Sequence, residues 1–289
     1  MSFATWHRVT DTKLFYEKSV PFFIKDEAMY NLPLGIAGRL KANPKTFGDA
    51  IYLYILTESP SLDSKPLGAI WWTPPYSLGM SNITKDEIEL FFRTQKLVDR
   101  PQALCGPSES ITQFALSLGS KWADYLNGID IQEQGIYSLS KLTDWFKDVQ
   151  GQGRVAIESD FDKVLSWSEN FIVDCKSTRP QKFEVSVRDA VLSGSRVLWV
   201  VNGEVVSMAG TAGETPNGSR VAWVYTPSAL RGHGYGGAVT RYLSERQLSH
   251  GKKFCFLYTD MANPTSNSIY KKLGYEFVGS SQNVMLQKN

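Results

Sequence analysis

The C-terminal half of the chain alternates between helical and strand-like hydrophobic patterns. Between residues 159 and 175 apolar residues recur at helical spacing, and Ser159 or Asp160 is placed to cap this helix. Apolar, β-branched runs flank Asn202-Gly203, a dipeptide typical of a tight hairpin. In chain order the patterns predict helices at 159–175 and 185–194, strands at 195–201, 204–213 and 219–226, a helix at 237–251, a strand at 252–259, a helix at 263–274 and a final strand pair within 275–288.

The N-terminal half is less regular. Its patterns predict strands at 50–56, 66–72 and 134–140 and helices at 85–98 and 108–126. Residues 149–160 contain two glycines and no clear element, so we place a domain boundary near residue 150. We therefore expect two domains, 1–150 and 151–289, in an α+β protein whose helices interleave with a mixed, mostly antiparallel central sheet.

Composition supports a globular protein and excludes several classes. A chain of 289 residues is long enough for two domains, and its net charge of +2 lacks the basic excess of a nucleic-acid-binding protein. Three separated cysteines and three histidines form neither a disulfide framework nor a metal-ligand pattern. No apolar run approaches the ~20 residues of a membrane helix. We expect a cytoplasmic protein that binds neither metal nor membrane.

The stretch RGHGYGG, residues 231–237, carries the clearest chemical signal. It follows a predicted strand and leads into a predicted helix, whose N-terminus exposes unpaired N–H groups. Gly232, Gly234 and Gly236 remove side chains that would hold a ligand away, and Arg231 adds donors. The combination favours a pyrophosphate site, with a ligand-free flexible turn as the alternative. No Lys-Ser/Thr follows, and antiparallel strands precede the glycines, so neither common nucleotide loop applies.

Two stretches together resemble the GNAT superfamily of N-acetyltransferases. VYTPSALRGHGYGGAV (224–239) is similar to its cofactor signature, a strand, V-x-x-P, Q/R-x-x-G-x-G/A and a helix. TDMANPTSNSIYKKLGYEFVG (259–279) is similar to its second landmark, an Asn-containing loop, a helix with a late tyrosine and Gly-Tyr-x-x-x-Gly. The resemblance covers roughly residues 160–280. The first half shows only a strand–loop–strand echo at 52–72, which implies a tandem GNAT protein with a degenerate N-terminal copy.

The resemblance implies acetyl-CoA as cosubstrate. Its pantetheine arm is expected to lie along the third strand of the second half, which in the family splays from its neighbour, here 253–258, and leaves an N–H for the oxyanion. Its pyrophosphate is expected on the N–H groups of the glycine-rich corner. The cofactor-binding residues so implied are Val224, Tyr225, Thr226, Arg231, Gly232, His233, Gly234, Tyr235, Gly236 and Asn263.

Tyr270 matches the usual general acid of the family and would protonate the departing thiolate, unless it only packs its helix against the sheet. Asn263 would bind the cofactor or cap the helix. His233 lies in the phosphate loop and is not expected to act as a base. The strand at 219–226 has no acidic residue, and Glu204 and Glu214 are expected at the surface, so the sequence names no general base.

The acceptor is expected to be a small-molecule or peptidyl amine, bound by a monomer or a homodimer. The N-terminal domain would shape its site, with the aromatic stretch 70–80 as a candidate wall or, alternatively, a buried strand and a Pro-Pro turn. The rival function is an acyl-CoA-binding module without transfer. Another nucleotide in the loop fits less well, because the preceding strand suits a peptide-like arm.

Overall fold

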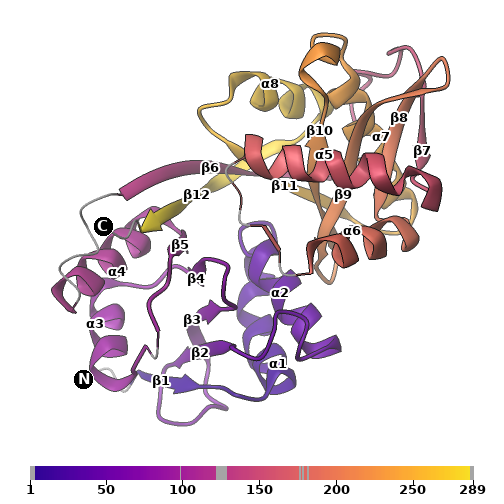
Figure 1. The fold of residues 1–289 in the computed structure, drawn as a ribbon. Helices are drawn as coiled ribbons and strands as arrows, with labels where there is room; N and C mark the ends of the chain where they lie inside the picture. Colours follow the sequence, from indigo (N-terminus) through magenta and orange to yellow (C-terminus); the bar gives the residue numbers. More distant parts are fainter. Residues whose placement is uncertain are drawn as a thin grey trace. The chain divides into compact units, whose positions relative to one another are not determined.

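The computed structural model describes residues 4–97, 99–121, 129–175, 177, 179–180 and 182–286. The chain forms two compact units (Figure 1). Unit 1 comprises Met1–Ile136, Asp260–Ala262 and Gly279–Asn289, and unit 2 comprises Tyr137–Thr259 and Asn263–Val278. These units do not follow a single cut at residue 150, because the chain enters unit 2 earlier and its last strand returns to unit 1.

Two series of elements repeat one order along the chain: strand, two helices, three strands, helix, strand, helix, strand. The first series is β1 (Thr5–Arg8), α1 (Thr12–Phe23), η1 (Ile24–Asp26), α2 (Asn31–Ala42), β2 (Tyr52–Thr57), β3 (Pro66–Trp72), β4 (Leu78–Met80), α3 (Lys85–Thr94), β5 (Ala103–Gly106), α4 (Ser108–Lys121) and β6 (Ile129–Leu139). The second is β7 (Gln152–Val155), η3 (Glu158–Asp160), α5 (Phe161–Asp174), α6 (Phe183–Leu192), β8 (Arg196–Val201), β9 (Glu204–Glu214), β10 (Gly218–Tyr225), η4 (Ser228–Leu230), α7 (Tyr235–Ser249), β11 (Phe254–Asp260), α8 (Pro264–Leu273) and β12 (Glu276–Leu286).

The strands of the two series follow the same pairing pattern, in which five strands of one series are joined by the last strand of the other. The strand orders are β1-β2-β3-β4-β5-β12 and β6-β11-β10-β9-β8-β7. In both, the fourth and fifth strands of the series pair in parallel, and the other recorded pairs are antiparallel. The last strand of each series is thus exchanged: β6 lies next to β11, and residues 282–285 of β12 pair with 103–106 of β5. The expected α+β class is confirmed, and the repeat is more complete than the echo at 52–72 indicated.

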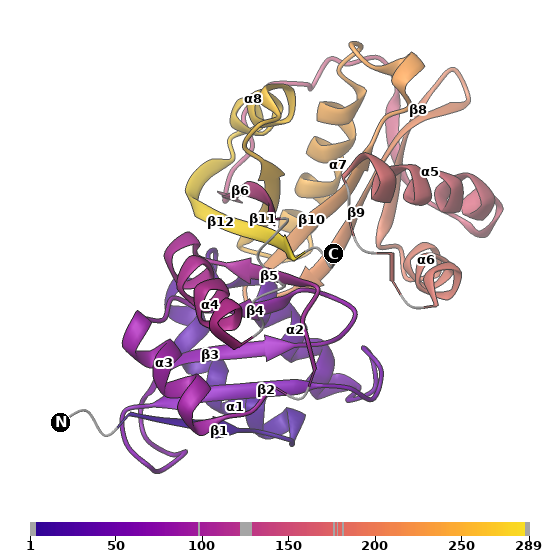
Figure 2. The same ribbon diagram turned by 60° about the vertical axis from the view of Figure 1, so that its left-hand side comes forward.

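Helices cover both faces of the sheet in unit 1, as Figure 2 shows for α1 and α2 on one side and α3 and α4 on the other. Alternate residues of β2 divide between these layers. Leu53 and Ile55 pack with α1 and α2, whereas Tyr54 and Leu56 pack with α3 and α4. Because both faces are covered, the strand reads as a continuous apolar run and not as an alternation.

The structure distinguishes between the two alternatives for residues 70–80. Trp71 and Trp72 of β3 are each 3% exposed and lie in the two cores of unit 1. A cis peptide joins Pro74 to Pro75 in the turn that follows. The stretch is a buried strand and a Pro-Pro turn, and the prediction of an aromatic wall is wrong because neither indole reaches the surface.

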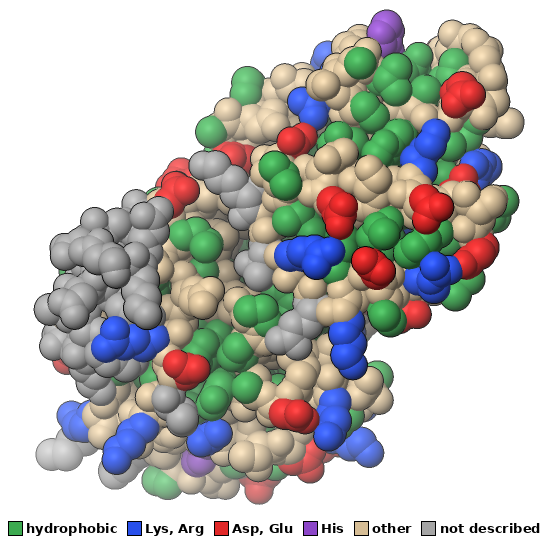
Figure 3. All heavy atoms as spheres, in the orientation of Figure 1, with side chains coloured by type: hydrophobic (Ala, Val, Ile, Leu, Met, Phe, Trp, Pro, Cys, Tyr) green, Lys and Arg blue, Asp and Glu red, His purple; other side chains and the backbone are tan. Residues whose placement is uncertain are grey.

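In unit 2 the same two-layer arrangement surrounds β8 and β9. Val197 and Trp199 pack in a core with α7, whereas Leu198 and Met208 pack with α5 and α6. The Asn202-Gly203 hairpin is confirmed, with both residues at positive φ, 50° and 84°. Figure 3 shows acidic and basic side chains interspersed over α5 and α6 on this face of unit 2.

Two local predictions in the second half were wrong. The described part of the stretch 275–288 forms one long strand, β12 (Glu276–Leu286), and not a pair. A Cβ on its Gly279 would lie 2.6 Å from Met29 Sδ, so this glycine permits close packing and does not mark a turn. The expected cap of α5 is also absent. Asp160 stands at the N-cap position without bonding the helix N–H groups.

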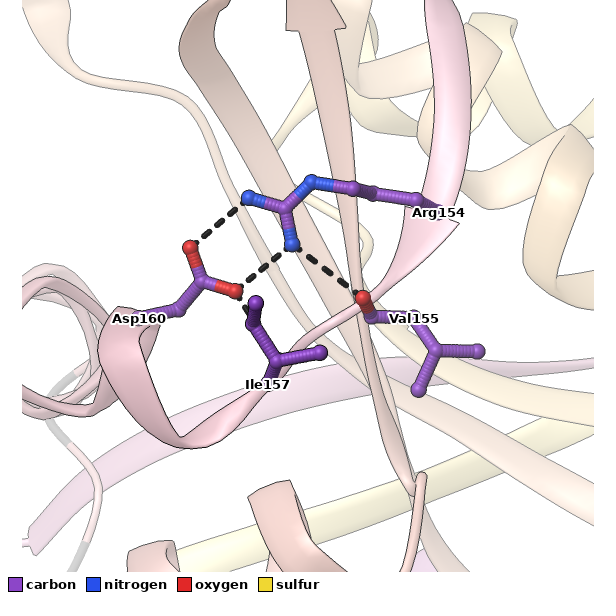
Figure 4. Close-up of polar contacts among 4 residues, drawn as sticks. All are labelled: Arg154, Val155, Ile157 and Asp160. Carbon is purple, nitrogen blue, oxygen red and sulfur yellow. Dashed lines mark hydrogen bonds and ion pairs between the residues drawn. The ribbon is translucent and has the colours of Figure 1, made fainter.

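The Asp160 carboxylate instead ties β7 to the start of α5 (Figure 4). Arg154 donates two hydrogen bonds to it, at 2.6 and 2.7 Å, and the N–H of Ile157 donates a third at 2.8 Å. The Arg154 hydrogen bond is the largest cause that lowers the pKa of Asp160 below its ordinary value. The second structural series is therefore anchored by a forked ion pair at its first turn.

Replacing Asp160 by Asn is expected to lower the free energy of unfolding by about 2 kcal/mol, because a fork of charge-assisted hydrogen bonds is lost. A lowered native pKa stabilises the fold above the unfolded carboxyl's pKa, near 4, and this contribution disappears as pH falls below it. Urea unfolding at pH 7 and pH 3 measures both effects. The matched control is Asp144→Asn. The Asp144 carboxylate is exposed beside Lys147, so its substitution should change stability little. Equal losses in the two variants would contradict the assignment.

No helix in the described ranges is both long and apolar enough to span a membrane. The same residues contain no group of three or more His, Cys, Asp or Glu side chains arranged to hold a metal ion.

Candidate acetyl-CoA site

The glycine-rich corner, residues 231–237, leads from β10 through η4 into α7. Gly232 and Gly234 have φ values of 88° and 81°, which other L residues rarely adopt. Gly234 is the N-cap of α7, which has no side-chain cap and no acidic residue in its first turn. Among the described residues, none accepts a hydrogen bond from the N–H groups of residues 232–237. The corner thus presents a row of free donors at the positive end of a helix, an arrangement suited to an anion.

The glycines of the corner serve different needs. A Cβ on Gly237 would lie 2.6 Å from the ring of Phe146, so this glycine permits packing and not ligand approach. A Cβ on Gly236 would only touch Thr226 Oγ1, at 3.5 Å, and one on Gly232 would meet nothing within 4 Å. The space around Gly232 and Gly236 would allow a ligand to approach the protein backbone closely, and their role in cofactor binding stays a prediction.

The side chain of Arg231 holds the corner to its surroundings. Its Nε donates to the carbonyl oxygen of Thr226 at 3.0 Å, and Nη2 lies 2.8 Å from the Asp174 carboxylate at the end of α5. The guanidinium therefore fixes the loop, and its role as a phosphate ligand stays a prediction. The rings of His233 and Tyr235 stack, with centroids 5.4 Å apart, and give the loop an aromatic edge.

β10 is bulged and separates from β11 just before the corner. Parallel pairing with β11 extends only from Gly218 to Arg220. On the other side the register with β9 shifts between Ala222 and Tyr225, and Trp223 has φ 57°. A positive φ at a tryptophan is uncommon and marks the bulge. The strand beyond Arg220, with Val224 and Tyr225, is consequently open on its β11 side, as the splay predicted from the family resemblance requires.

The bulge shifts the alternation of side chains between the two faces, because Val221 packs in the core with α7 and Trp223, two residues later, lies on the opposite face. Trp223 and Tyr225 pack toward α5 and α6, whereas Val224 packs toward the core that includes α7. Phe171 lies against Trp223, with ring centroids 5.0 Å apart, and Trp167 lies against Tyr225 at 5.8 Å. Sequence reasoning missed this aromatic cluster. The helical spacing of Trp167 and Phe171 was visible, but the bulge that brings Trp223 to them has no local signal.

Tyr270, on α8, packs against the same core as Val224 and Tyr235. No described residue gives its hydroxyl a hydrogen-bond partner. Burial raises the pKa of this phenol above its ordinary value, and the neighbouring Cys175 thiol adds to the increase. Asp174, at the end of α5, thus bonds Arg231 of the corner, and Tyr270 packs against the same core as Tyr235 of the corner.

Asn263 caps α8, with its side-chain oxygen accepting the N–H of Ser266 at 3.1 Å. Its predicted contact with the cofactor stays a prediction. Glu214 pairs with Lys252 at 2.9 Å, and Glu204 is exposed at the hairpin, so both are surface residues as expected.

The helix of unit 1 that corresponds to α7 in chain order is α3, and its N-terminus is closed. Thr84 Oγ1 accepts the N–H of Glu87, whose carboxylate accepts the N–H of Thr84 at 2.7 Å. Asp86 and Glu87 also place negative charge in the first turn. These side chains occupy the donors and repel an anion, so the same position in the two series has opposite electrostatic character.

Residues 197–284 match a family model described as FR47-like protein. This range contains β8 to β11 with the bulge, the glycine-rich corner and α8. A search of curated proteins finds no match.

Solved structures match along the whole chain. A Drosophila structural-genomics protein aligns with a TM-score of 0.69 at 11% identity, covering 98% of this chain and 99% of that one. An acetyltransferase from the GNAT family of Colwellia psychrerythraea aligns with a TM-score of 0.60 at 8% identity, covering 98% and 100%. A tandem GNAT protein from the clavulanic acid biosynthesis pathway aligns with a TM-score of 0.54 at 11% identity, covering 99% of each chain. With the repeated element order, the splayed β10 and the glycine-rich corner, these matches show that the chain has the tandem GNAT fold.

Proposed function

We propose that this protein transfers an acetyl group from acetyl-CoA to the primary amine of an acceptor, in unit 2. The observation that carries the proposal is the row of unbonded N–H groups at residues 232–237, directly after a strand that is open on one edge. A pyrophosphate fits the first feature and a peptide-like pantetheine arm fits the second.

The proposed reaction uses few groups. The amine nitrogen attacks the thioester carbonyl carbon, and an N–H of the open part of β10, near Val224, stabilises the oxyanion. The carbon–sulfur bond then breaks, and Tyr270 donates its proton to the departing thiolate. The attacking amine loses one proton to water, since no carboxylate is assigned as its base, and the Tyr270 phenolate takes up a proton from water.

Unit 1 is proposed to bind no acetyl-CoA. The capping box and acidic first turn of α3 support this, because both remove the donors that the α7 N-terminus offers. Unit 1 is therefore the degenerate copy, and its proposed role is structural, around β5 and β12.

Titration calorimetry is expected to give one acetyl-CoA per chain, with a Kd in the micromolar range. S-acetylpantetheine, which lacks the pyrophosphate, should bind at least about tenfold more weakly, since the loss of one charge-assisted contact exceeds 1.4 kcal/mol. Two molecules bound per chain would contradict the assignment of unit 1. Absence of binding would overturn the proposal.

An acyl-CoA-binding module without transfer is the second candidate, favoured by the lack of an acidic side chain on the open part of β10. Both functions would use the glycine-rich corner to bind the cofactor. They differ in the role of Tyr270, so substitution of Tyr270 distinguishes them.

A further inference from the structure

Arg196, the first residue of β8, is a buried cation without a counter-charge. The residue is only 3% exposed, and its guanidinium forms no ion pair with any described residue. One hydrogen bond is recorded, from Nη1 to the carbonyl oxygen of Thr211 at 3.4 Å, and Nε is buried without a partner. Burial lowers the pKa of the guanidinium to about 9, so it remains charged at neutral pH. A buried charge in this state is costly unless an anion accompanies it.

The sheet register places this guanidinium beside the bulge. Arg196 pairs with Gly210 of β9, and Gly210 pairs with Ala222 of β10, so the three residues form one row across the sheet. A Cβ on Gly210 would lie 2.3 Å from Arg196 Nη1, which shows that the side chain crosses β9 through the space that this glycine leaves. Its guanidinium carbon ends 4.6 Å from the ring centroid of Trp223.

The guanidinium lies beside the proposed reaction centre. Trp223 immediately precedes Val224, near which the oxyanion would be held. The aromatic cluster of Trp223, Phe171, Trp167 and Tyr225 lies on the same face, toward α5 and α6. A buried guanidinium with an unpartnered Nε and an aromatic surface therefore meet at Trp223, in the open part of β10.

We infer that Arg196 binds a carboxylate of the acceptor, which makes the acceptor class a free amino acid. This inference rests on the proposed transferase function and deepens it. The planar guanidinium matches a carboxylate with two parallel hydrogen bonds, which a lysine or a carbonyl acceptor cannot reproduce. The aromatic cluster is placed to contact the amino acid's side chain. The carboxylate is unchanged in the reaction: its neighbouring amine gains the acetyl group, and the thiolate gains the proton of Tyr270.

The test compares amino acids with their carboxamides, using protein saturated with CoA so that no transfer occurs. Glycine, L-leucine and L-phenylalanine are titrated against glycinamide, L-leucinamide and L-phenylalaninamide by calorimetry. The wild-type protein is expected to bind at least one acid at least tenfold more tightly than its amide. The ratio should fall to about one in Arg196→Met and be partly retained in Arg196→Lys.

Gly210→Ala provides a second variant that keeps the arginine and displaces its guanidinium, and it should lose the same preference. Arg188→Met, which removes an exposed arginine of α6, should keep it. Acetyl-CoA affinity is measured in every protein, so a failure of the proposed function appears separately, as absent acetyl-CoA binding in the wild type. The inference is overturned if acids and amides bind alike, if no acid binds, or if Arg196→Met keeps the ratio.

Discussion

Replacing Gly234 by valine is expected to weaken acetyl-CoA binding at least about a hundredfold, because two or more charge-assisted hydrogen bonds of about 1.5–3 kcal/mol each would be lost. The residue is the N-cap of α7 and has φ 81°, a conformation that a β-branched side chain resists strongly. Its Cβ would also lie 3.2 Å from Val149 Cγ2. The backbone must therefore rotate, and the N–H groups that follow turn away from a common point.

A matched control separates the loss of the anion site from backbone strain. Gly203 has φ 84° in the β8–β9 hairpin, and a Cβ there would meet nothing within 4 Å. Gly203→Val should cost similar stability, by thermal denaturation, and leave acetyl-CoA affinity unchanged by calorimetry. If both variants bind acetyl-CoA like the wild type, the corner is a turn and the pyrophosphate site is excluded.

The parts of the fold that the sequence predicted well are those with local causes. Helical periodicity located α5 and α7 to within about two residues, and Asn202-Gly203 located the β8–β9 hairpin. The cap of α5 was predicted wrongly because a local rule competed with a tertiary contact. Arg154, six residues earlier, binds the Asp160 carboxylate with two hydrogen bonds and removes it from the helix N–H groups.

Exchange of the final strands could not be predicted from local patterns. β6 lies next to β11, and β12 pairs with β5, so each sheet is completed by a strand from the other series. Any apolar strand of suitable length satisfies a hydrophobic pattern, and the pattern does not say which edge receives it. The exchange also has a practical consequence, because a cut at residue 150 would remove β6 from beside β11.

The candidate site likewise contains parts with a local sequence signal and parts without one. The glycine-rich corner and Tyr270 were predicted because their signals are contiguous in sequence. The bulge at Trp223 and the crossing of Arg196 over Gly210 were not, since both depend on pairing between strands. The sequence shows an arginine at the start of the apolar strand 196–201. Only its burial in the structure indicates that this arginine has a special role.

Tyr270→Phe is expected to lower kcat about a hundredfold or more, the scale of general acid catalysis, and to leave the Kd for acetyl-CoA unchanged. The raised pKa keeps the phenol protonated through the neutral range, so its ionisation should not reduce the wild-type rate below about pH 10. Single-turnover assays between pH 6 and pH 10, with calorimetry of acetyl-CoA, measure both quantities. An acyl-CoA-binding module would show no transfer in either protein.

The neighbouring Tyr275 is the matched control because its hydroxyl has a structural partner. It is 2% exposed, its ring centroid lies 6.0 Å from that of Tyr270, and its hydroxyl lies 2.8 Å from Ser244 Oγ. Tyr275→Phe should lower the free energy of unfolding by about 1 kcal/mol and leave kcat of the folded protein unchanged. Tyr270→Phe should do the reverse, since no described residue bonds its hydroxyl and little stability is at stake. If Tyr270→Phe loses stability and keeps its rate, the residue only packs α8 against the sheet, and the proton for the thiolate must come from water.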